Sequence, residues 1–423
     1  MSSPARDACP GLIALHPARD GGVARIRLPG GYVSGPRWQA LARLASDLGD
    51  GQLDLTSRGN VQLRGIRDSA PGELASRAAA AGLLPSAEHD RARNIMASPL
   101  AGLGGRPPLR QLVRRLDHVL LADPALAALP GRFLFSLDDG TGGAGLAGCD
   151  IGLRRVGEGM EVVVAGRRAG VHVRVRAAVT AAATAARAAI VAGVGSRVTR
   201  IADLADGGEA VAAAIGGTLG APAGGPESRL PLGVAARDPR LSGGPAELVT
   251  TVVAAPLARV SSTQIELIAS VLAAREVVRI GIAGRLVVPL EVPVPGLPAA
   301  PAGGESARAP AARPASAGAG PALLSLTSPD EALARLASAG LIVSPGHELA
   351  DVTACSGAAC SRSLADVRAV AAPVPGHPRP HWSGCARTCG LPPDAEPVIA
   401  VDAGRYLVPG ADQPVPCEML MTR

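Results

Sequence analysis

Four cysteines near the C-terminus have the residue types and spacing of a set of metal ligands. Cys355 and Cys360 lie in TACSGAAC, and Cys385 and Cys389 lie in HWSGCARTCG. The glycines and serines beside them let the backbone wrap around a metal centre, and backbone N–H groups near the sulfurs stabilise negative charge. Because the whole chain has only seven cysteines, this grouping indicates a metal site.

An iron–sulfur cluster is the interpretation that these spacings favour, and three others stay open. Structural zinc is often held by four cysteines, but paired zinc ligands usually enclose two residues, whereas these pairs enclose four and three. Disulfides belong mainly to secreted proteins, and the N-terminal MSSPARDACPG lacks the apolar core of a signal peptide. Inert thiols are the last possibility, and they describe best the remaining cysteines, Cys9, Cys149 and Cys417.

The composition predicts a cytoplasmic protein that binds neither membranes nor nucleic acid. No run of uncharged apolar residues reaches the length of a transmembrane helix, and the nearest candidate, an alanine-rich stretch, contains Arg187. The net charge of +6 comes entirely from arginine, since the chain has no lysine. Scattered arginines with 1% aromatic residues do not suit nucleic acid, whereas guanidinium groups bind carboxylates well. An acidic small molecule is therefore the expected ligand.

A second motif supplies polar groups for such a ligand. The segment LTSRGNVQLRG, residues 55–65, alternates as a strand with one polar face would. That face would carry four side chains: Arg58, Asn60, Gln62 and Arg64. Three more donors precede a turn in RARNIMASPLAG: Arg91, Arg93 and Asn94. The alternative for the first segment is an edge strand whose polar face is only solvated.

Two related α/β halves are expected to position these residues. Residues 25–66 and 251–290 each follow the pattern strand, proline, polar turn, helix, short loop, strand, with Pro29 and Pro256 at matching places. Apolar residues recur at helical spacing in the first half at Trp38, Leu41, Ala42 and Ala45, and in the second at Ile265, Ile268 and Leu272. Such a repeat predicts two halves that enclose a ligand about a pseudo-two-fold axis.

Together with the rest of the chain, these halves are expected to form an α/β protein. Five parts are expected: a first half at 1–70, an α/β domain at 71–205, a second half at 206–293, a Pro/Ala/Gly linker at 294–322 and the cysteine segment at 323–423. Within them we expect a flexible Gly/Ala loop at 206–228 and a helix in SPDEALARLASAGL. GAGLAG at 143–148 matches a dinucleotide motif, but the following CDIGLRRV alternates like a strand, so no such site is expected.

These segments resemble a known superfamily. TSRGNVQLRG, RNIMASPLAG and the two cysteine pairs are similar to the nitrite/sulfite reductases. Within that superfamily, CPGLIALHPARDGGVARIRLPGG, LDLTSRGNVQLRG and GLIVSPGHELADVTAC resemble the precorrin-3B synthases of aerobic cobalamin biosynthesis. The resemblance implies duplicated ferredoxin-like halves, nitrite/sulfite reductase-type α/β domains, and a 4Fe–4S cluster held by the four cysteines. It covers most of the chain outside the alanine-rich middle and the linker.

The resemblance also implies a reaction and its partners. Precorrin-3B synthases are iron–sulfur monooxygenases that use O2 to hydroxylate C20 of precorrin-3A and close a lactone. Electrons would come from an external donor such as a ferredoxin or flavoprotein, and a second, non-haem iron is implied. The substrate carboxylates would meet Arg58, Asn60, Gln62, Arg64, Arg91, Arg93, Asn94 and Arg279, with Arg285 a less well matched candidate. The family usually has five residues between its first two cysteines, one more than this chain has.

Two other functions stay open at this point. A sirohaem-dependent sulfite or nitrite reductase would use the same scaffold with the tetrapyrrole as cofactor. Those reductases usually carry lysines among their anion-reducing residues, and this chain has none. A non-catalytic iron–sulfur or tetrapyrrole-binding protein is the other alternative, which the short gap between the first two cysteines would suit.

Overall fold

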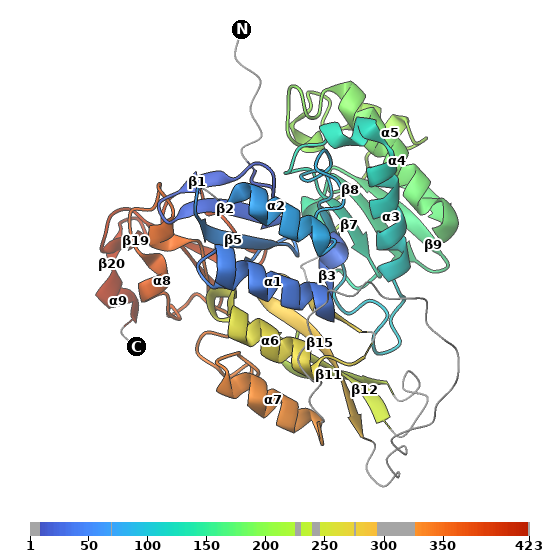
Figure 1. The fold of residues 1–423 in the computed structure, drawn as a ribbon. Helices are drawn as coiled ribbons and strands as arrows, with labels where there is room; N and C mark the ends of the chain where they lie inside the picture. Colours follow the sequence, from blue (N-terminus) through green and yellow to red (C-terminus); the bar gives the residue numbers. More distant parts are fainter. Residues whose placement is uncertain are drawn as a thin grey trace.

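The computed structural model describes residues 9–68, 70–224, 230–238, 246–274, 276–293 and 326–421. Within these residues the strands form four five-stranded sheets in a mixed α/β arrangement (Figure 1). The linker predicted at 294–322 lies outside the described residues, as do parts of the second half predicted at 206–293.

The first two sheets belong to the duplicated halves. The first has the order β1 (His16–Ala18), β2 (Gly21–Ile26), β5 (Val61–Ile66), β4 (Gln52–Leu55) and β13 (Arg259–Ser261). The second has the order β11 (Gly233–Asp238), β12 (Ala246–Ala254), β15 (Arg285–Pro293), β14 (Val277–Ile280) and β3 (Tyr32–Ser34). Their helices are α1 (Gly35–Leu48), α2 (Pro71–Ala80), α6 (Ser262–Val271) and α7 (Pro329–Ser338). These helices form one layer over the sheets (Figure 1).

The two halves exchange a short strand. β3 precedes α1 in the chain, yet it pairs with β14 of the second sheet, with Val33 opposite Val278. β13 precedes α6, yet it pairs with β4 of the first sheet, with Val260 opposite Leu53. Buried residues of both halves therefore form one hydrophobic core.

The element order confirms the predicted duplication. β2, a 3₁₀ turn, β3, α1, β4 and β5 correspond to β12, a second 3₁₀ turn, β13, α6, β14 and β15. The two turns begin at Pro29 and Pro256, as the repeat predicts. The predicted apolar faces of the two helices are buried, and α1 and α6 pack against each other.

The strand predicted over residues 55–65 is wrong, because a turn interrupts it. The Thr56 hydroxyl accepts hydrogen bonds from the N–H groups of Arg58 (3.4 Å) and Asn60 (3.1 Å), and Gly59 has a φ of 68°. The turn residues 56–60 are Thr, Ser, Arg, Gly and Asn, a composition typical of turns that the strand interpretation overlooked. Of the four side chains predicted on the polar face, Arg58 and Asn60 lie in the turn, and Gln62 and Arg64 lie on β5.

The third sheet has the order β10 (Arg167–Arg174), β9 (Gly159–Val164), β8 (Ile151–Val156), β7 (Phe135–Asp138) and β6 (Ile95–Ala97). Its helices are α3 (Arg110–Ala122), α4 (Val175–Ala192) and α5 (Glu209–Ala213). β8 follows GAGLAG, as expected. The flexible loop predicted at 206–228 is wrong in part, because α5 lies in it and the Thr218 N–H donates to the Ala169 carbonyl oxygen at 3.0 Å.

Helix α4 is long and apolar enough to cross a membrane. Its alanine-rich face is buried, however, and packs against β8, β9 and β10. This is the environment of a core helix in a soluble protein, as the sequence predicts for this stretch.

The fourth sheet contains the cysteine segment. Its order is β16 (Thr353–Ala354), β17 (Pro380–Ser383), β18 (Glu396–Ala400), β19 (Arg405–Leu407) and β20 (Val415–Pro416). Two short helices accompany it, α8 (Val367–Val370) and α9 (Cys417–Met421). The helix predicted before this segment is α7, and its predicted N-cap, Ser328, accepts a hydrogen bond from the Glu331 N–H at 3.1 Å.

Candidate functional site

The cysteine quartet, which comprises Cys355, Cys360, Cys385 and Cys389, lies at one edge of the fourth sheet. β16 and β17 are parallel neighbours. Cys355 directly follows β16, and Cys385 follows β17 after one intervening glycine. The carboxyl ends of parallel strands meet at the same edge of a sheet. The fold therefore brings together two cysteine loops that are distant in sequence.

The surroundings of the sulfurs suit bound thiolates. The Cys355 sulfur accepts hydrogen bonds from the N–H groups of Gly384 (3.2 Å) and Gly357 (3.4 Å). Partial removal from water raises the pKa of Cys389, and negative charge on the other three members of the quartet raises it further. The other three sulfurs are thus close enough to Cys389 to disfavour its thiolate. A cationic metal centre would relieve that repulsion.

The donor set fits an iron–sulfur cluster. Within the described residues, no three His, Cys, Asp or Glu side chains form a group that could hold a single metal ion. Iron–sulfur clusters are held by cysteine thiolates, and N–H groups directed at sulfur are a usual part of their surroundings. The Cys355 sulfur has two such N–H groups.

Tight backbone turns hold both cysteine loops. The first loop contains a 3₁₀ turn, Gly357–Ala359, in which the Cys360 N–H donates to the Gly357 carbonyl oxygen at 2.9 Å. In the second loop, the Thr388 N–H donates to the Cys385 carbonyl oxygen at 3.3 Å. His381, on β17, lies between the Thr353 hydroxyl (2.9 Å) and the Cys389 carbonyl oxygen (3.3 Å). Burial lowers the pKa of His381 to about 4, so the ring is neutral at pH 7. His381 therefore links β16 to the second cysteine loop.

Arg64, one of the predicted ligand-binding residues, anchors the first cysteine loop instead. Its guanidinium makes two hydrogen bonds with Asp20, at 2.9 and 3.0 Å. The same group donates to the Ser356 hydroxyl and to the Ala359 carbonyl oxygen, both at 3.1 Å. Ser356 and Ala359 lie between Cys355 and Cys360. Arg64 thus fastens the quartet to the first sheet.

Replacing Arg64 by methionine should loosen this loop. The change leaves the partly buried Asp20 without its partner, so we expect the free energy of unfolding to fall by about 3 kcal/mol and iron retention to fall with it. Urea unfolding and iron analysis measure both effects. Arg77→Met is the matched control, since its pairs with Asp47 and Glu73 are exposed and worth about 0.5 kcal/mol. Equal losses in the two variants would show that Arg64 is not an anchor.

Beside this anchor lies an arginine cluster, defined as Arg25, Arg27, Arg58 and Arg200. Arg27 is only 2% exposed, and its Nη2 donates to the Gly131 carbonyl oxygen at 3.2 Å. Its Nε and Nη1 are buried without a hydrogen-bond partner. Burial and then Arg25 lower the pKa of Arg27 to about 9, and burial, Arg200 and Arg25 lower the pKa of Arg58 to about 10.

Arginine side chains stay protonated in proteins, so the direction of these shifts indicates an electrostatic cost. Arg200 is compensated by Asp150, whose carboxylate oxygen lies 2.6 Å from its Nε, whereas the buried Arg27 keeps two nitrogen atoms to which negative charge could still be added. Carboxylates arriving on a ligand would supply that charge and the missing hydrogen-bond acceptors. The cluster is therefore suited to bind a polyanion.

Two predicted residues belong to this region. The Arg58 guanidinium donates to the Arg132 carbonyl oxygen at 2.9 Å. Gln62 lies opposite Arg25 on neighbouring strands, and in the orientation that satisfies both partners its amide oxygen accepts from the Arg25 Nε at 3.1 Å. These contacts leave Arg58 with further donors for a ligand.

Three other predicted residues form hydrogen bonds or ion pairs with neighbouring parts of the chain. Asn60 accepts from the Leu28 N–H at 2.9 Å and donates to Asn94 at 2.8 Å, which holds the turn that carries Arg58. Arg93 forms a two-point ion pair with Asp117, at 2.7 and 2.9 Å. These three predicted residues position neighbouring structure.

Three more predicted arginines remain to be placed. Arg279 donates to the Pro99 and Ala101 carbonyl oxygens, at 3.1 and 2.7 Å, and Arg285 donates to Asp351 at 2.9 Å. Arg91 is half-buried before β6. Arg279 and Arg285 thus make these contacts within the protein.

Sequence reasoning missed three members of the cluster: Arg25, Arg27 and Arg200. A signal existed for two of them, because Arg25 and Arg27 alternate in ARIRL and therefore share a face of the chain. Arg200 lies between α4 and α5 in irregular structure and has no local pattern. Only the fold brings it close to Arg58.

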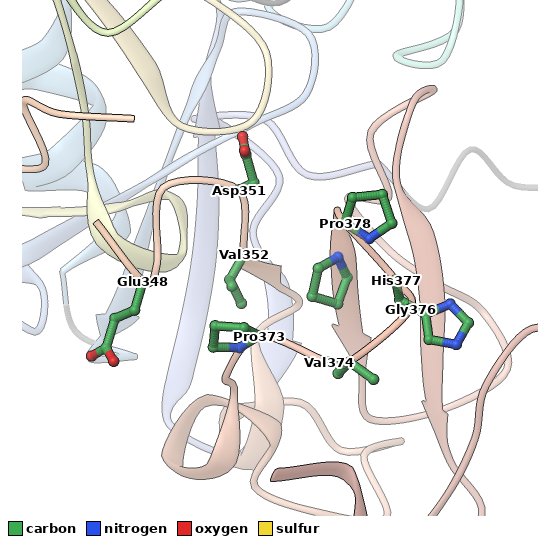
Figure 2. A pocket seen from close by; sticks show the side chains of 9 residues that line it. Glu348, Asp351, Val352, Pro373, Val374, Gly376, His377 and Pro378 are labelled. Carbon is green, nitrogen blue, oxygen red and sulfur yellow. The ribbon is translucent and has the colours of Figure 1, made fainter. Parts of the chain in front are cut away.

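A separate groove of about 350 Å³ lies beside the fourth sheet, and Figure 2 shows the side chains that line it. Its lining is rich in prolines and carboxylates: Glu348, Asp351, Val352, Pro373, Val374, Gly376, His377, Pro378 and Pro380. It contains none of the predicted ligand-binding residues and no member of the quartet. Its acidic lining does not suit a polycarboxylate.

Comparisons with known proteins support the nitrite/sulfite reductase superfamily. Residues 16–81 match the nitrite/sulfite reductase ferredoxin-like half domain. A ferredoxin–nitrite reductase of Leptolyngbya laminosa is 33% identical over 119 residues, 26% of this chain and 23% of that protein. A precorrin-3B synthase of a Sinorhizobium species is 36% identical over 75 residues, 18% of this chain and 16% of that protein. The matches thus span a quarter or less of these relatives.

The fold likeness extends over nearly the whole chain. The structure of the Mycobacterium tuberculosis NirA protein aligns with a TM-score of 0.67, covering 94% of this chain and 78% of that one at 19% identity. The expected fold class, with duplicated ferredoxin-like halves, is confirmed.

Proposed function

We propose that this protein is an iron–sulfur monooxygenase of the precorrin-3B synthase type, which acts in the cytoplasm on precorrin-3A in cobalamin biosynthesis. The quartet would hold a 4Fe–4S cluster. The arginine cluster would bind carboxylates of the tetrapyrrole. A ferredoxin or flavoprotein would supply electrons.

One observation carries the proposal: the quartet and the arginine cluster are neighbours on a single sheet face. Gln62 and Arg64 are two residues apart on β5, so their side chains share a face. Gln62 contacts Arg25 of the cluster, and Arg64 holds the loop between Cys355 and Cys360. A redox centre beside a polycarboxylate site is what an enzyme needs to oxidise or reduce a bound tetrapyrrole.

In the proposed reaction one oxygen atom of O2 enters the substrate as the C20 hydroxyl and the other leaves as water. Two electrons from the donor and two protons complete the balance, and the ring A acetate closes the lactone. The bound cluster would supply single electrons to the site. The chain's own part is to orient the carboxylates with Arg27 and Arg58 and to fix the Arg58 turn through Asn60 and Asn94. In the described residues no group of three ligands is available for a second iron, and none is assigned.

A sirohaem-dependent reductase is the second candidate, favoured by the longer match to the nitrite reductase, 119 residues against 75. There the arginine cluster would hold the tetrapyrrole as cofactor. Absorbance of anaerobically purified protein separates the candidates. Iron–sulfur absorption without a sirohaem Soret band supports the synthase, a strong Soret band supports the reductase, and zinc without iron or sulfide contradicts both.

Replacing Arg58 by alanine should weaken tetrapyrrole binding. Removal of one charge-assisted contact is worth about 2 kcal/mol, or roughly a thirtyfold rise in Kd. Quenching of uroporphyrin fluorescence measures this, because uroporphyrin is a stable tetrapyrrole with eight carboxylates. The exposed Arg67 provides the control variant, Arg67→Ala. Equal affinities in both variants would remove Arg58 from the site.

A further inference from the structure

Arg368 contacts the backbone of the first cysteine loop at a member of the quartet. It lies on α8, which follows that loop in the chain, and its side chain is 17% exposed. Its Nε donates to the carbonyl oxygen of Cys355 at 2.8 Å. Arginine stays protonated in proteins. The contact therefore places a permanent positive charge directly beside a proposed cluster ligand.

The packing of Gly357 holds Arg368 against the same loop. The Gly357 N–H donates to the Cys355 sulfur at 3.4 Å, and the φ of this glycine is 58°. A Cβ atom added at Gly357 would lie 3.4 Å from the backbone nitrogen of Arg368 and 3.5 Å from its Cγ. The aliphatic part of Arg368 thus packs against the residue that hydrogen-bonds the Cys355 sulfur. The guanidinium is therefore fixed near the quartet.

The carboxylate of Asp54 compensates Arg368 but is shared with a second arginine. Its Oδ1 accepts from the Arg368 Nη2 at 3.2 Å and lies 3.2 Å from the Arg259 Nε. Asp54 is 6% exposed, and it lies opposite Arg259 where β4 pairs with the exchanged strand β13. Arg259 has a further partner in Asp50. Removing Arg368 would therefore leave the buried carboxylate paired, and removing the carboxylate would leave Arg259 paired.

The charge beside the quartet thus depends on two side chains of opposite sign. Reduction of an iron–sulfur cluster adds one electron, and the reduction potential depends on nearby charge, on hydrogen bonds to sulfur and on exposure to solvent. Charges interact more strongly in a partly buried site than in water. Arg368 should therefore favour the reduced form of a cluster held by the quartet, and Asp54 should disfavour it.

We propose that Arg368 and Asp54 together set the reduction potential of the cluster held by the quartet. This inference rests on the proposed function, since it requires that cluster. Arg368 raises the potential, so that one electron leaves the ferredoxin or flavoprotein donor and enters the cluster more readily. Asp54 limits this effect and directs Arg368 at the Cys355 carbonyl oxygen. Both are positioning residues, because they act through the backbone of a ligand.

The test measures the reduction potential of the cluster in the anaerobically purified full chain, by dithionite titration followed with electron paramagnetic resonance. Arg368→Met should make one-electron reduction about tenfold less favourable, a fall of about 59 mV. Asp54→Asn should make reduction at least about threefold more favourable. Arg368→Lys keeps the positive charge and should stay within about threefold of the unchanged protein. Loss of a purely structural contact would not produce shifts of opposite sign.

Arg379→Met is the matched control, because it removes an arginine from the same sheet far from the quartet. Arg379 pairs with Asp394 at 2.7 Å and directly precedes β17, at the opposite end of that strand from Cys385. Its removal should change the reduction equilibrium by less than about twofold.

Each outcome decides a separate point. If the cluster titrates and Arg368→Met has the same potential as Arg379→Met, or if Arg368→Met and Asp54→Asn shift the potential in the same direction, the proposed roles are wrong while the proposed function stands. If Arg368→Met loses its iron, Arg368→Lys and Asp54→Asn decide the question by the same titration. If the unchanged protein holds no iron–sulfur cluster, the proposed function and this inference are both overturned.

Discussion

Replacement of Cys389 by serine should leave the protein without a stable iron–sulfur cluster. A serine hydroxyl is a much poorer ligand for cluster iron than a thiolate. Mutation of groups that only support a metal ligand already costs about ten- to a hundredfold in metal affinity, so loss of a ligand itself should cost more. Iron and acid-labile sulfide should fall to less than about a tenth of their original content, and any activity should vanish. Because Cys389 is exposed, the fold should survive, as circular dichroism can show.

Cys417→Ser is the control for this experiment. Cys417 lies in the same C-terminal region, half-buried at the start of α9, but outside the quartet. The Cys417→Ser protein should keep its full iron and sulfide content. A Cys389→Ser protein that retained both, or an unchanged protein that contained only zinc, would contradict the assignment of the quartet.

Replacement of Arg27 by methionine should make the ligand-free protein more stable and abolish tetrapyrrole binding. Methionine fills a similar volume and removes a buried charge with two unpaired nitrogen atoms. Replacing poorly compensated buried charge by apolar side chains is often stabilising, and we expect a gain of about 2 kcal/mol. Uroporphyrin affinity should fall by at least about a hundredfold. Urea unfolding and fluorescence titration measure the two effects.

Arg93→Met provides a matched comparison. Arg93 is also buried, but its two-point ion pair with Asp117 is intact. Its removal leaves an unpaired carboxylate and should destabilise the protein by about 3 kcal/mol. If the free energy of unfolding rises in Arg27→Met and falls in Arg93→Met, Arg27 is a residue that serves binding at a cost in stability. Destabilisation of equal size in both would mean that Arg27 is structural.

The elements with the strongest periodicity could be predicted from sequence. The apolar faces of α1 and α6, the N-cap of α7 at Ser328 and the duplication around Pro29 and Pro256 all rest on local patterns, and the structure confirms them. The exchanged strands β3 and β13 could not be predicted. Each has three residues, and its pairing is set by the opposite half of the chain.

The site was predictable only in part for the same reason. The cysteine spacing is a local signal, whereas the anchoring of the quartet by Arg64 joins residues about three hundred positions apart. Arg58, Gln62 and Arg64 were predicted from one alternating segment to share a role. In the structure Arg58 and Gln62 lie at the arginine cluster, whereas Arg64 holds the loop between Cys355 and Cys360. Arg200 reaches the cluster only through the packing of the third sheet against the first half.

The most direct test of the central claim is the fate of labelled oxygen. The anaerobically purified protein should be mixed with precorrin-3A and an excess of reduced ferredoxin, which supplies the two electrons, then exposed to ¹⁸O2, and the product examined by mass spectrometry. We predict a hydroxylated lactone that contains one ¹⁸O atom, and no such product from Cys389→Ser. A precorrin-3A that stays unchanged, from a protein that carries sirohaem and reduces nitrite or sulfite, would contradict the proposed monooxygenase.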